Sequence, residues 1–171
     1  RYQGTLLTSS PSRSDTTHLM IEDLLQQQGW NNGWSTLLKI GGNLATISSR
    51  SFGVANKIST GLGDAGPIID NYANVLLNNS TLRFSYFPNS RAAPMFIAIT
   101  NGSEHSQEAG RFINFLLSQE GQQALSDSDS GKYPVYPLPS GTPLAEQQLR
   151  LFSSPSLDYP LIMQRQKLVQ L

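Results

Sequence analysis

The sequence predicts an α/β fold with a largely parallel sheet, and two observations lead to that prediction. Short apolar runs of the kind that form strands alternate along the chain with longer stretches that carry a helical stripe of apolar side chains. Turn residues such as Gly, Pro and Asn separate these stretches repeatedly. Strands that alternate with helices favour parallel pairing, because each helix returns the chain to the starting edge of the sheet.

The first half of the chain is expected to hold three such strand-helix units. An extended run at 4–10 precedes Pro11, and Ser14 or Asp15 is expected to cap a helix that ends at Gly29. The stretches that follow are predicted as a helix at 33–43 with Trp34, Leu37 and Leu38 facing inward, a strand at 44–48, a helix at 50–60 capped by Ser48 or Ser49, a buried strand at 65–70 that closes on Asp70, and a helix at 71–79.

The second half is expected to continue with two strands and a long amphipathic helix. Alternation predicts a strand at 82–88, and a more continuous apolar run predicts another at 95–100. A helix follows whose apolar face is expected to be core, and it continues or restarts at 118–125; its markers are Glu108, Ala109, Phe112, Phe115, Leu116 and Leu117. A loop at 127–143, a helix at 144–152 and an irregular tail complete the chain.

The amino-acid composition excludes several classes of partner and of chemistry. Lys and Arg together number 12, as do Asp and Glu, so no charge excess favours nucleic acid as a partner. Cysteine is absent, which excludes disulfides and thiolate chemistry, and only His18 and His105 could supply imidazole. We expect no metal and no cofactor. No apolar stretch approaches the roughly 20 residues of a membrane-spanning helix.

The stretch "TSSPSRSDTTH" at 8–18 is the leading candidate site. Hydroxyl groups straddle a predicted helix start there, at Ser12, Ser14, Thr16 and Thr17. The first backbone N–H groups of a helix lack internal partners, and together with the helix dipole they suit a phosphate, phosphonate or carboxylate. Helix capping alone explains the same residues, and the spacing by itself favours capping. Asp15 counts against a dense anion site unless it meets a cationic group of the ligand.

A hydrolase is the rival hypothesis. Ser14 and His18 lie one helical turn apart and could act as nucleophile and base on a phosphate ester, or Asp15 could be the nucleophile. No third orienting group and no GxSxG motif support this hypothesis. A structural interaction module without a small ligand is the third possibility left open by the residues.

Three segments, taken in order, carry a resemblance to a known family. They are "SSPSRSDTTH", "GWSTLLKIGGNLATISSRSFGVANKISTGLGDAGPIID", and "FPNSRAAPMFIAITNGSEHSQEAGRFINFLLSQEGQQAL" followed by "YPVYP". This series resembles family 1 extracellular solute-binding proteins, the periplasmic receptors of ABC importers, and is most similar to the branch that serves phosphoglycerate transport. The piece "FINFLLSQEGQQAL" is the most specific part of the match.

The resemblance implies a periplasmic binding protein type II-like lobe that closes on its ligand like a hinge, here as the C-terminal part of a two-lobed protein. It places the second lobe at residues 1–90, a strand-helix segment that returns to the first lobe at 91–137, and a C-terminal helix and tail at 138–171. It further implies a bacterial periplasmic location and no enzymatic activity.

The resemblance also implies which residues meet the ligand. It puts the hydroxyl loop with Asp15 at the cleft, although the family commonly has Gly at that position. It adds a second helix start and a strand end, at Arg50, Ser51, Asp70, Asn71 and Tyr72. Iron-binding members carry adjacent tyrosines after that strand, whereas Tyr72 stands alone here, so an organic phosphate or phosphonate is favoured over iron.

The implied partners follow from the family's role. They are a small anionic ligand, an ABC transporter permease or a membrane sensor, and the missing N-terminal lobe or a second copy of the chain.

Overall fold

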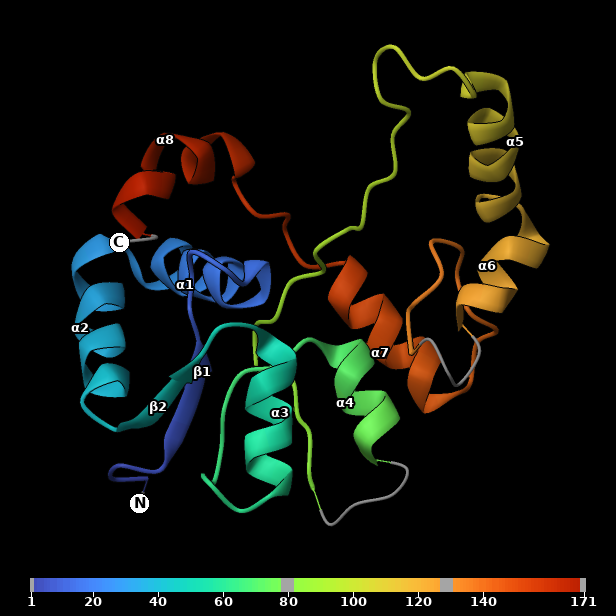
Figure 1. Cartoon of the computed structure of the whole chain (residues 1–171). Coiled ribbons are helices and arrows are strands. Elements are labelled where there is room, and N and C mark those ends of the chain that lie inside the picture. Colours follow the sequence, from blue (N-terminus) through green and yellow to red (C-terminus); the bar gives the residue numbers. More distant parts are fainter. Residues whose placement is uncertain (1, 78–81, 127–130, 170–171) are drawn as a thin grey trace. The chain divides into compact units, whose positions relative to one another are not determined.

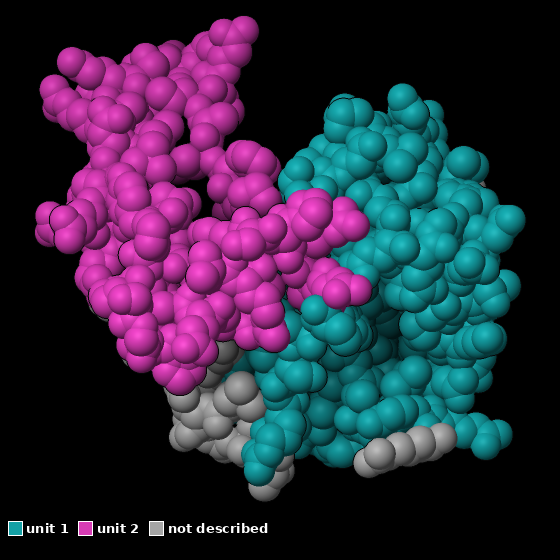
Figure 2. All heavy atoms as spheres, turned by 180° about the vertical axis from the view of Figure 1, so that it is seen from behind, with its two compact units in different colours: residues 1–88, 156–171 teal, residues 89–155 magenta. Residues whose placement is uncertain are grey.

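The computed structural model of this chain describes residues 2–77, 82–126 and 131–169. The chain divides into two compact units, coloured separately in Figure 2. Unit 1 comprises residues 1–88 and 156–171, and unit 2 comprises residues 89–155. The C-terminal segment therefore returns to the unit in which the chain begins.

A two-stranded parallel sheet organises unit 1. Strand β1 (Leu6–Ser9) pairs with strand β2 (Leu44–Ser48), and the register runs from Leu6 opposite Leu44 to Ser9 opposite Ser48. A third extended stretch lies along the other edge of β1, where Ala65 forms a parallel bridge with Leu6 and accepts a 2.8 Å hydrogen bond from the Leu7 amide. The predicted parallel α/β character is confirmed in this sheet.

The described part of unit 1 also contains five helices (Figure 1). Their bounds are α1 (Asp15–Gln28), α2 (Trp30–Gly41), α3 (Ser51–Ser59), α4 (Asp70–Leu77) and α8 (Tyr159–Val169). Gly29, with φ of 75°, separates α1 from α2, and this left-handed backbone is the conformation that glycine adopts without steric cost. The predicted helices at 15–28 and 71–79 are thus confirmed, apart from residues 78 and 79, which lie outside the described residues.

The core of unit 1 forms where α3 packs on β1. Leu7 and Val54 are almost fully buried, at 1% and 0% exposure. Gly66 packs against both: a Cβ there would lie 2.6 Å from the Leu7 carbonyl oxygen and 2.6 Å from Cγ1 of Val54. Only a glycine lets residue 66 approach this closely. The other buried apolar residues of the unit are Leu25, Ala55, Ala73, Leu157, Ile162 and Val169.

Three helices lie in the described part of unit 2: α5 (Ser106–Leu116), α6 (Gln119–Ser126) and α7 (Pro143–Phe152). Buried glutamines organise it. Gln148 donates to the carbonyls of Pro134 and Tyr136 at 2.8 and 2.9 Å and accepts from the Leu138 amide at 2.8 Å. Gln122 likewise accepts from the Val135 amide at 2.7 Å. These side chains hold the described part of the predicted loop, 131–142, against α6 and α7.

Three predicted strands are absent from the residues that the structure describes. Residues 82–88 and 95–100 form no ladder, and the stretch 65–70 contributes only the single bridge at Ala65 before α4 begins at Asp70. A strand forms only where a neighbouring strand completes its backbone hydrogen bonds. A local pattern of apolar residues does not show whether such a neighbour is present. Within 95–100 the side chains of Met95 and Phe96 are 74% and 82% exposed.

Helix boundaries and faces also differ from expectation. Helix α2 begins at Trp30 rather than at 33, and Leu38 is 72% exposed rather than inward. Helix α3 has Arg50 at its N-cap position in place of Ser48 or Ser49. Residues 159–169 form α8 although an irregular tail was expected, because tertiary contacts with α1 stabilise a helix whose apolar pattern is weak.

The aromatic face expected to be core in the second half is not buried. Phe112 and Phe115 on α5 are 55% and 44% exposed, and α5 has no buried residue. The periodicity correctly predicted a helix, but burial depends on what packs against its face, which the pattern does not contain.

Candidate functional site

The candidate site lies where the two parallel strands end. Ser9 and Ser48 are paired at the last position of β1 and β2, and the Ser10 amide donates a 2.8 Å hydrogen bond to the Ser48 carbonyl. Parallel neighbours end at the same edge of a sheet, so the helices that follow them, α1 and α3, both begin at this edge (Figure 1). Two helix N-termini with their unpaired amides therefore share one location.

Hydroxyl groups connect the two helix starts. Thr16 in the first turn of α1 donates from Oγ1 to Oγ of Ser51, the first residue of α3, at 3.4 Å. The next residue, Thr17, forms a buried hydroxyl–hydroxyl bond with Ser9 at the end of β1. Ser51, Thr17 and Ser9 are each at least nine-tenths buried. The sheet edge and both helix starts are consequently fixed relative to one another.

The hydrogen bonding of the Ser14 side chain bears on whether it caps α1 or is available to a ligand. Ser14 occupies the N-cap position of α1 with an extended backbone (φ −137°, ψ 107°), yet its side chain makes no capping hydrogen bond. Ser14 is only 5% exposed, and its hydroxyl forms no hydrogen bond within the described part of the chain. Ser14 therefore holds the predicted N-cap position, but its side chain supplies no capping hydrogen bond.

Ser48 is a second uncommitted hydroxyl at this edge. It is 8% exposed, and its Oγ has no hydrogen-bond partner among the described residues. A buried hydroxyl without a partner costs stability unless a ligand or water satisfies it. Ser48 and Ser9 were not predicted as site residues. The signal that would have found them is their shared position: each is a serine at the end of a strand in adjacent strand-helix units.

The remaining residues of the loop are peripheral. Ser12 is exposed, and its Oγ lies 3.0 Å from that of Ser10. Asp15 is exposed in the first turn of α1. Arg50 is also exposed, at the N-cap position of α3, and it is the predicted site residue with a positive charge. The predicted set thus divides into a buried hydroxyl group (Ser14, Thr17, Ser51), a half-buried Thr16 and an exposed rim.

The third predicted contact, at the start of α4, is built differently. Both carboxylate oxygens of Asp70 are engaged: Oδ1 accepts from the Asn71 amide at 2.8 Å and Oδ2 from the Tyr86 hydroxyl at 2.9 Å. Tyr72 is 42% exposed. No hydrogen bond in the described residues joins these side chains to the hydroxyls of α1 and α3. The Ala65 bridge, being parallel, directs this segment toward the same sheet edge.

The catalytic alternative is not assembled. No hydrogen bond from the Ser14 hydroxyl is present among the residues described, and Nε2 of buried His18 instead lies 3.9 Å from Oε1 of Glu22. A nucleophile needs its base within hydrogen-bond reach. Within residues 2–77, 82–126 and 131–169 no three acidic or histidine side chains are grouped to hold a metal ion.

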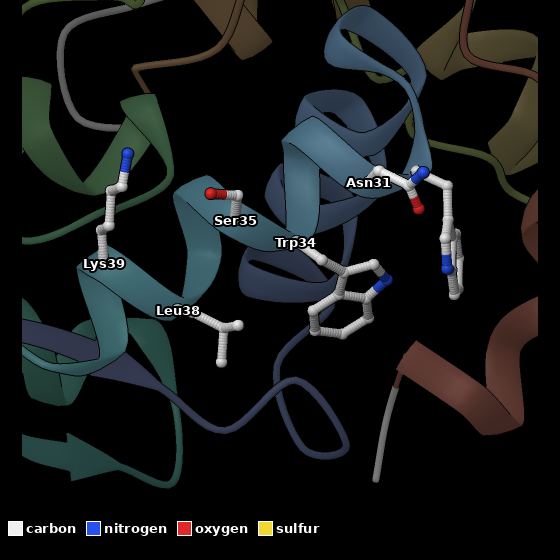
Figure 3. Close-up of a pocket in the computed structure, with 6 residues that line it drawn as sticks. Asn31, Trp34, Ser35, Leu38 and Lys39 are labelled. Atoms are coloured by element: carbon white, nitrogen blue, oxygen red, sulfur yellow. The ribbon is translucent and has the colours of Figure 1, made fainter.

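Unit 1 also has a shallow groove on α2, and none of the predicted site residues lines it (Figure 3). Trp30 and Trp34 pack edge to face there with ring centroids 5.6 Å apart. The groove contains one charged side chain, Lys39, and no acid–base pair. It offers an apolar surface rather than a catalytic arrangement.

Sequence similarity places the chain among known bacterial proteins. A family model described as bacterial extracellular solute-binding protein matches residues 1–159. The chain is 61% identical over 169 residues to "Phosphoglycerate transport regulatory protein PgtC" of Salmonella typhimurium (strain LT2) and equally to the protein of that name in Salmonella typhi. The alignments cover 99% of this chain but 43% of each relative, so the chain spans less than half their length. No solved structure matches.

Among the described residues, no helix combines the length and the apolar character needed to cross a lipid bilayer.

Proposed function

Because the chain belongs to the family of bacterial extracellular solute-binding proteins, we propose that it carries the anion-binding part of a receptor for a small phosphorylated or phosphonate compound. A phosphoglycerate is the leading candidate, since two relatives that are 61% identical bear that ligand in their names. The ligand's anionic group would sit at the shared start of α1 and α3.

One observation carries this proposal: two helix N-termini meet at one sheet edge, where the hydroxyls of Ser14 and Ser48 form no hydrogen bond with the described residues. Amides at a helix start and the positive end of its dipole stabilise a negative group, each by about 0.3–1 kcal/mol when exposed and more when buried. The Ser14 hydroxyl, 5% exposed and not used for capping, adds a donor without a fixed charge. Arg50 on the rim adds a cation for a second anionic group of the ligand.

The proposed role is non-enzymatic and periplasmic. The receptor would deliver its ligand to an ABC transporter permease or report it to a membrane sensor, as the word "regulatory" in the relatives' name suggests. Hinged receptors of this family hold the ligand between two lobes, so a partner lobe or a second copy of the chain would complete the site. One lobe alone should bind weakly, because half of the contacts are lost.

Calorimetry on the full-length protein, as its gene encodes it, tests the proposal. We expect 3-phosphoglycerate to bind and glycerate, which lacks the phosphate, to bind at least tenfold more weakly. Equal affinity for the two compounds would contradict a phosphate site. Phosphate release from 3-phosphoglycerate, abolished by His18→Ala, would instead establish the hydrolase alternative with Ser14, His18 or Asp15.

A further inference from the structure

The C-terminal helix α8 is fastened to α1, the helix whose start carries the proposed anion site. Gln26 on α1 makes two bonds to the backbone of Asp158, accepting from its amide at 2.9 Å and donating to its carbonyl at 3.4 Å. Asp158 in turn accepts from the Leu161 amide at 2.9 Å and so caps the first turn of α8. These bonds join chain segments that are 132 residues apart in sequence.

A buried ion pair forms the second attachment. Arg165 on α8 donates from Nε and Nη2 to the same oxygen of Glu22, Oε2, at 2.8 and 2.5 Å. The Glu22 side chain is 0% exposed and that of Arg165 is 13% exposed. The guanidinium also lies 5.4 Å from the ring centroid of Trp30. A buried carboxylate left without its counter-charge is strongly unfavourable, so α8 must stay docked for the Glu22 side chain to keep its counter-charge.

Glu22 is close enough to the start of α1 to influence an anion there. It lies seven positions after Asp15, which corresponds to about 10 Å along the helix axis. A unit charge at that distance, with an effective dielectric constant of about 20, changes an anion's affinity by on the order of tenfold. The group that faces Glu22 from its own helix is His18, at 3.9 Å, and Arg165 faces it from α8.

We propose that Arg165 is a positioning residue for the anion site, because it cancels the buried charge of Glu22 in the binding helix. This inference rests on the proposed function. Docking of α8 then raises anion affinity, and by reciprocity a bound anion strengthens the docking of α8. The C-terminal segment is in this way part of the binding apparatus, although it contributes no contact to the ligand.

Charge arithmetic makes the test specific in sign. In the full-length protein, Arg165→Gln leaves the Glu22 carboxylate uncompensated and should weaken 3-phosphoglycerate binding about tenfold. Glu22→Gln leaves the guanidinium uncompensated and should tighten binding several-fold. The double variant Glu22→Gln/Arg165→Gln should return to within about twofold of the wild type. Lys167→Gln, which removes an exposed cation from the same helix, is the matched control and should change affinity less than twofold.

A purely structural ion pair predicts a different result, in which both single variants weaken binding together. That outcome, or four affinities within twofold, would overturn the inference. If Arg165→Gln does not fold, Glu22→Gln against the double variant still isolates the charge of Arg165. Hydrogen exchange supplies a second readout: 3-phosphoglycerate should slow amide exchange in α8 of the wild type. Failure of the wild type itself to bind would instead contradict the proposed function.

Discussion

Thr16 and Ser51, which are 35 residues apart in the sequence, meet through their hydroxyl groups at 3.4 Å at the starts of two different helices. This contact joins the first turns of α1 and α3 at the sheet edge where β1 and β2 end. The amides that a helix cannot satisfy internally are thereby brought to one place from two helices. Two further contacts fix the same arrangement. They are the pairing of Ser9 with Ser48 in the sheet and the buried hydrogen bond between Ser9 and Thr17.

Ser14→Ala should weaken the binding of 3-phosphoglycerate at least tenfold, or about 1.4 kcal/mol, in the full-length protein. The same change should alter the free energy of unfolding by less than about 0.5 kcal/mol, since no capping hydrogen bond is lost. Calorimetry measures the first quantity and urea denaturation the second. The combination separates a ligand contact from a helix cap.

Thr142→Ala is the matched control for that experiment. Thr142 does cap its helix, accepting from the Ala145 amide at 3.1 Å, so its loss should cost about 1 kcal/mol of stability. The affinity of the Thr142→Ala variant for 3-phosphoglycerate should equal that of the wild type. If Ser14→Ala and Thr16→Ala both leave affinity untouched, the anion loop is excluded.

Gly66→Ala should destabilise unit 1 by about 2 kcal/mol or more, because a Cβ at 66 would lie 2.6 Å from both the Leu7 carbonyl oxygen and Cγ1 of Val54. Gly41→Ala, at the end of α2 with nothing within 4 Å of the added carbon, should change stability by less than about 1 kcal/mol. Thermal denaturation of the two variants gives the comparison. Equal melting temperatures would contradict the close approach of residue 66 to the core.

The first strand-helix unit could be predicted because its signals are local. Pro11 ends the extended run, Ser14 stands at the N-cap and Gly29 ends the helix, and each of these preferences depends on only a few neighbouring residues. The hydroxyl loop could be recognised for the same reason. The site roles of Ser9 and Ser48 were missed, since their importance arises only when two strands are paired in register.

The second half of the chain shows where local signals are insufficient. The apolar run at 95–100 was expected to be a strand, yet Phe96 is 82% exposed and the stretch has no ladder partner in the described part of the structure. Helix α8 was missed because its stability comes from Glu22 and Gln26 on α1, more than a hundred residues earlier. Long-range partners decide both cases, and a periodicity does not identify partners.

Gln148→Ala should destabilise unit 2 by about 2–4 kcal/mol, because it leaves the carbonyls of Pro134 and Tyr136 and the amide of Leu138 without their bonds. Gln107→Ala, on the exposed first turn of α5, should be within about 0.5 kcal/mol of the wild type. Urea denaturation followed by fluorescence and hydrogen exchange of residues 131–142 would measure the difference. A stable Gln148→Ala variant with unchanged hydrogen exchange in residues 131–142 would show that Gln148 does not hold this loop in place.

Thr17→Val should cost about 1–3 kcal/mol, because the substitution keeps the shape of the side chain but leaves the Ser9 hydroxyl, 0% exposed, without its partner. Adding Ser9→Ala removes that orphaned group, so the double variant should be more stable than the sum of the single losses predicts. A double-mutant cycle by urea denaturation measures this coupling, which we expect to be about 1 kcal/mol or more. Strict additivity would show that the two hydroxyls do not depend on each other. A positive coupling would demonstrate that the end of β1 and the first turn of α1 are held together beneath the proposed anion site.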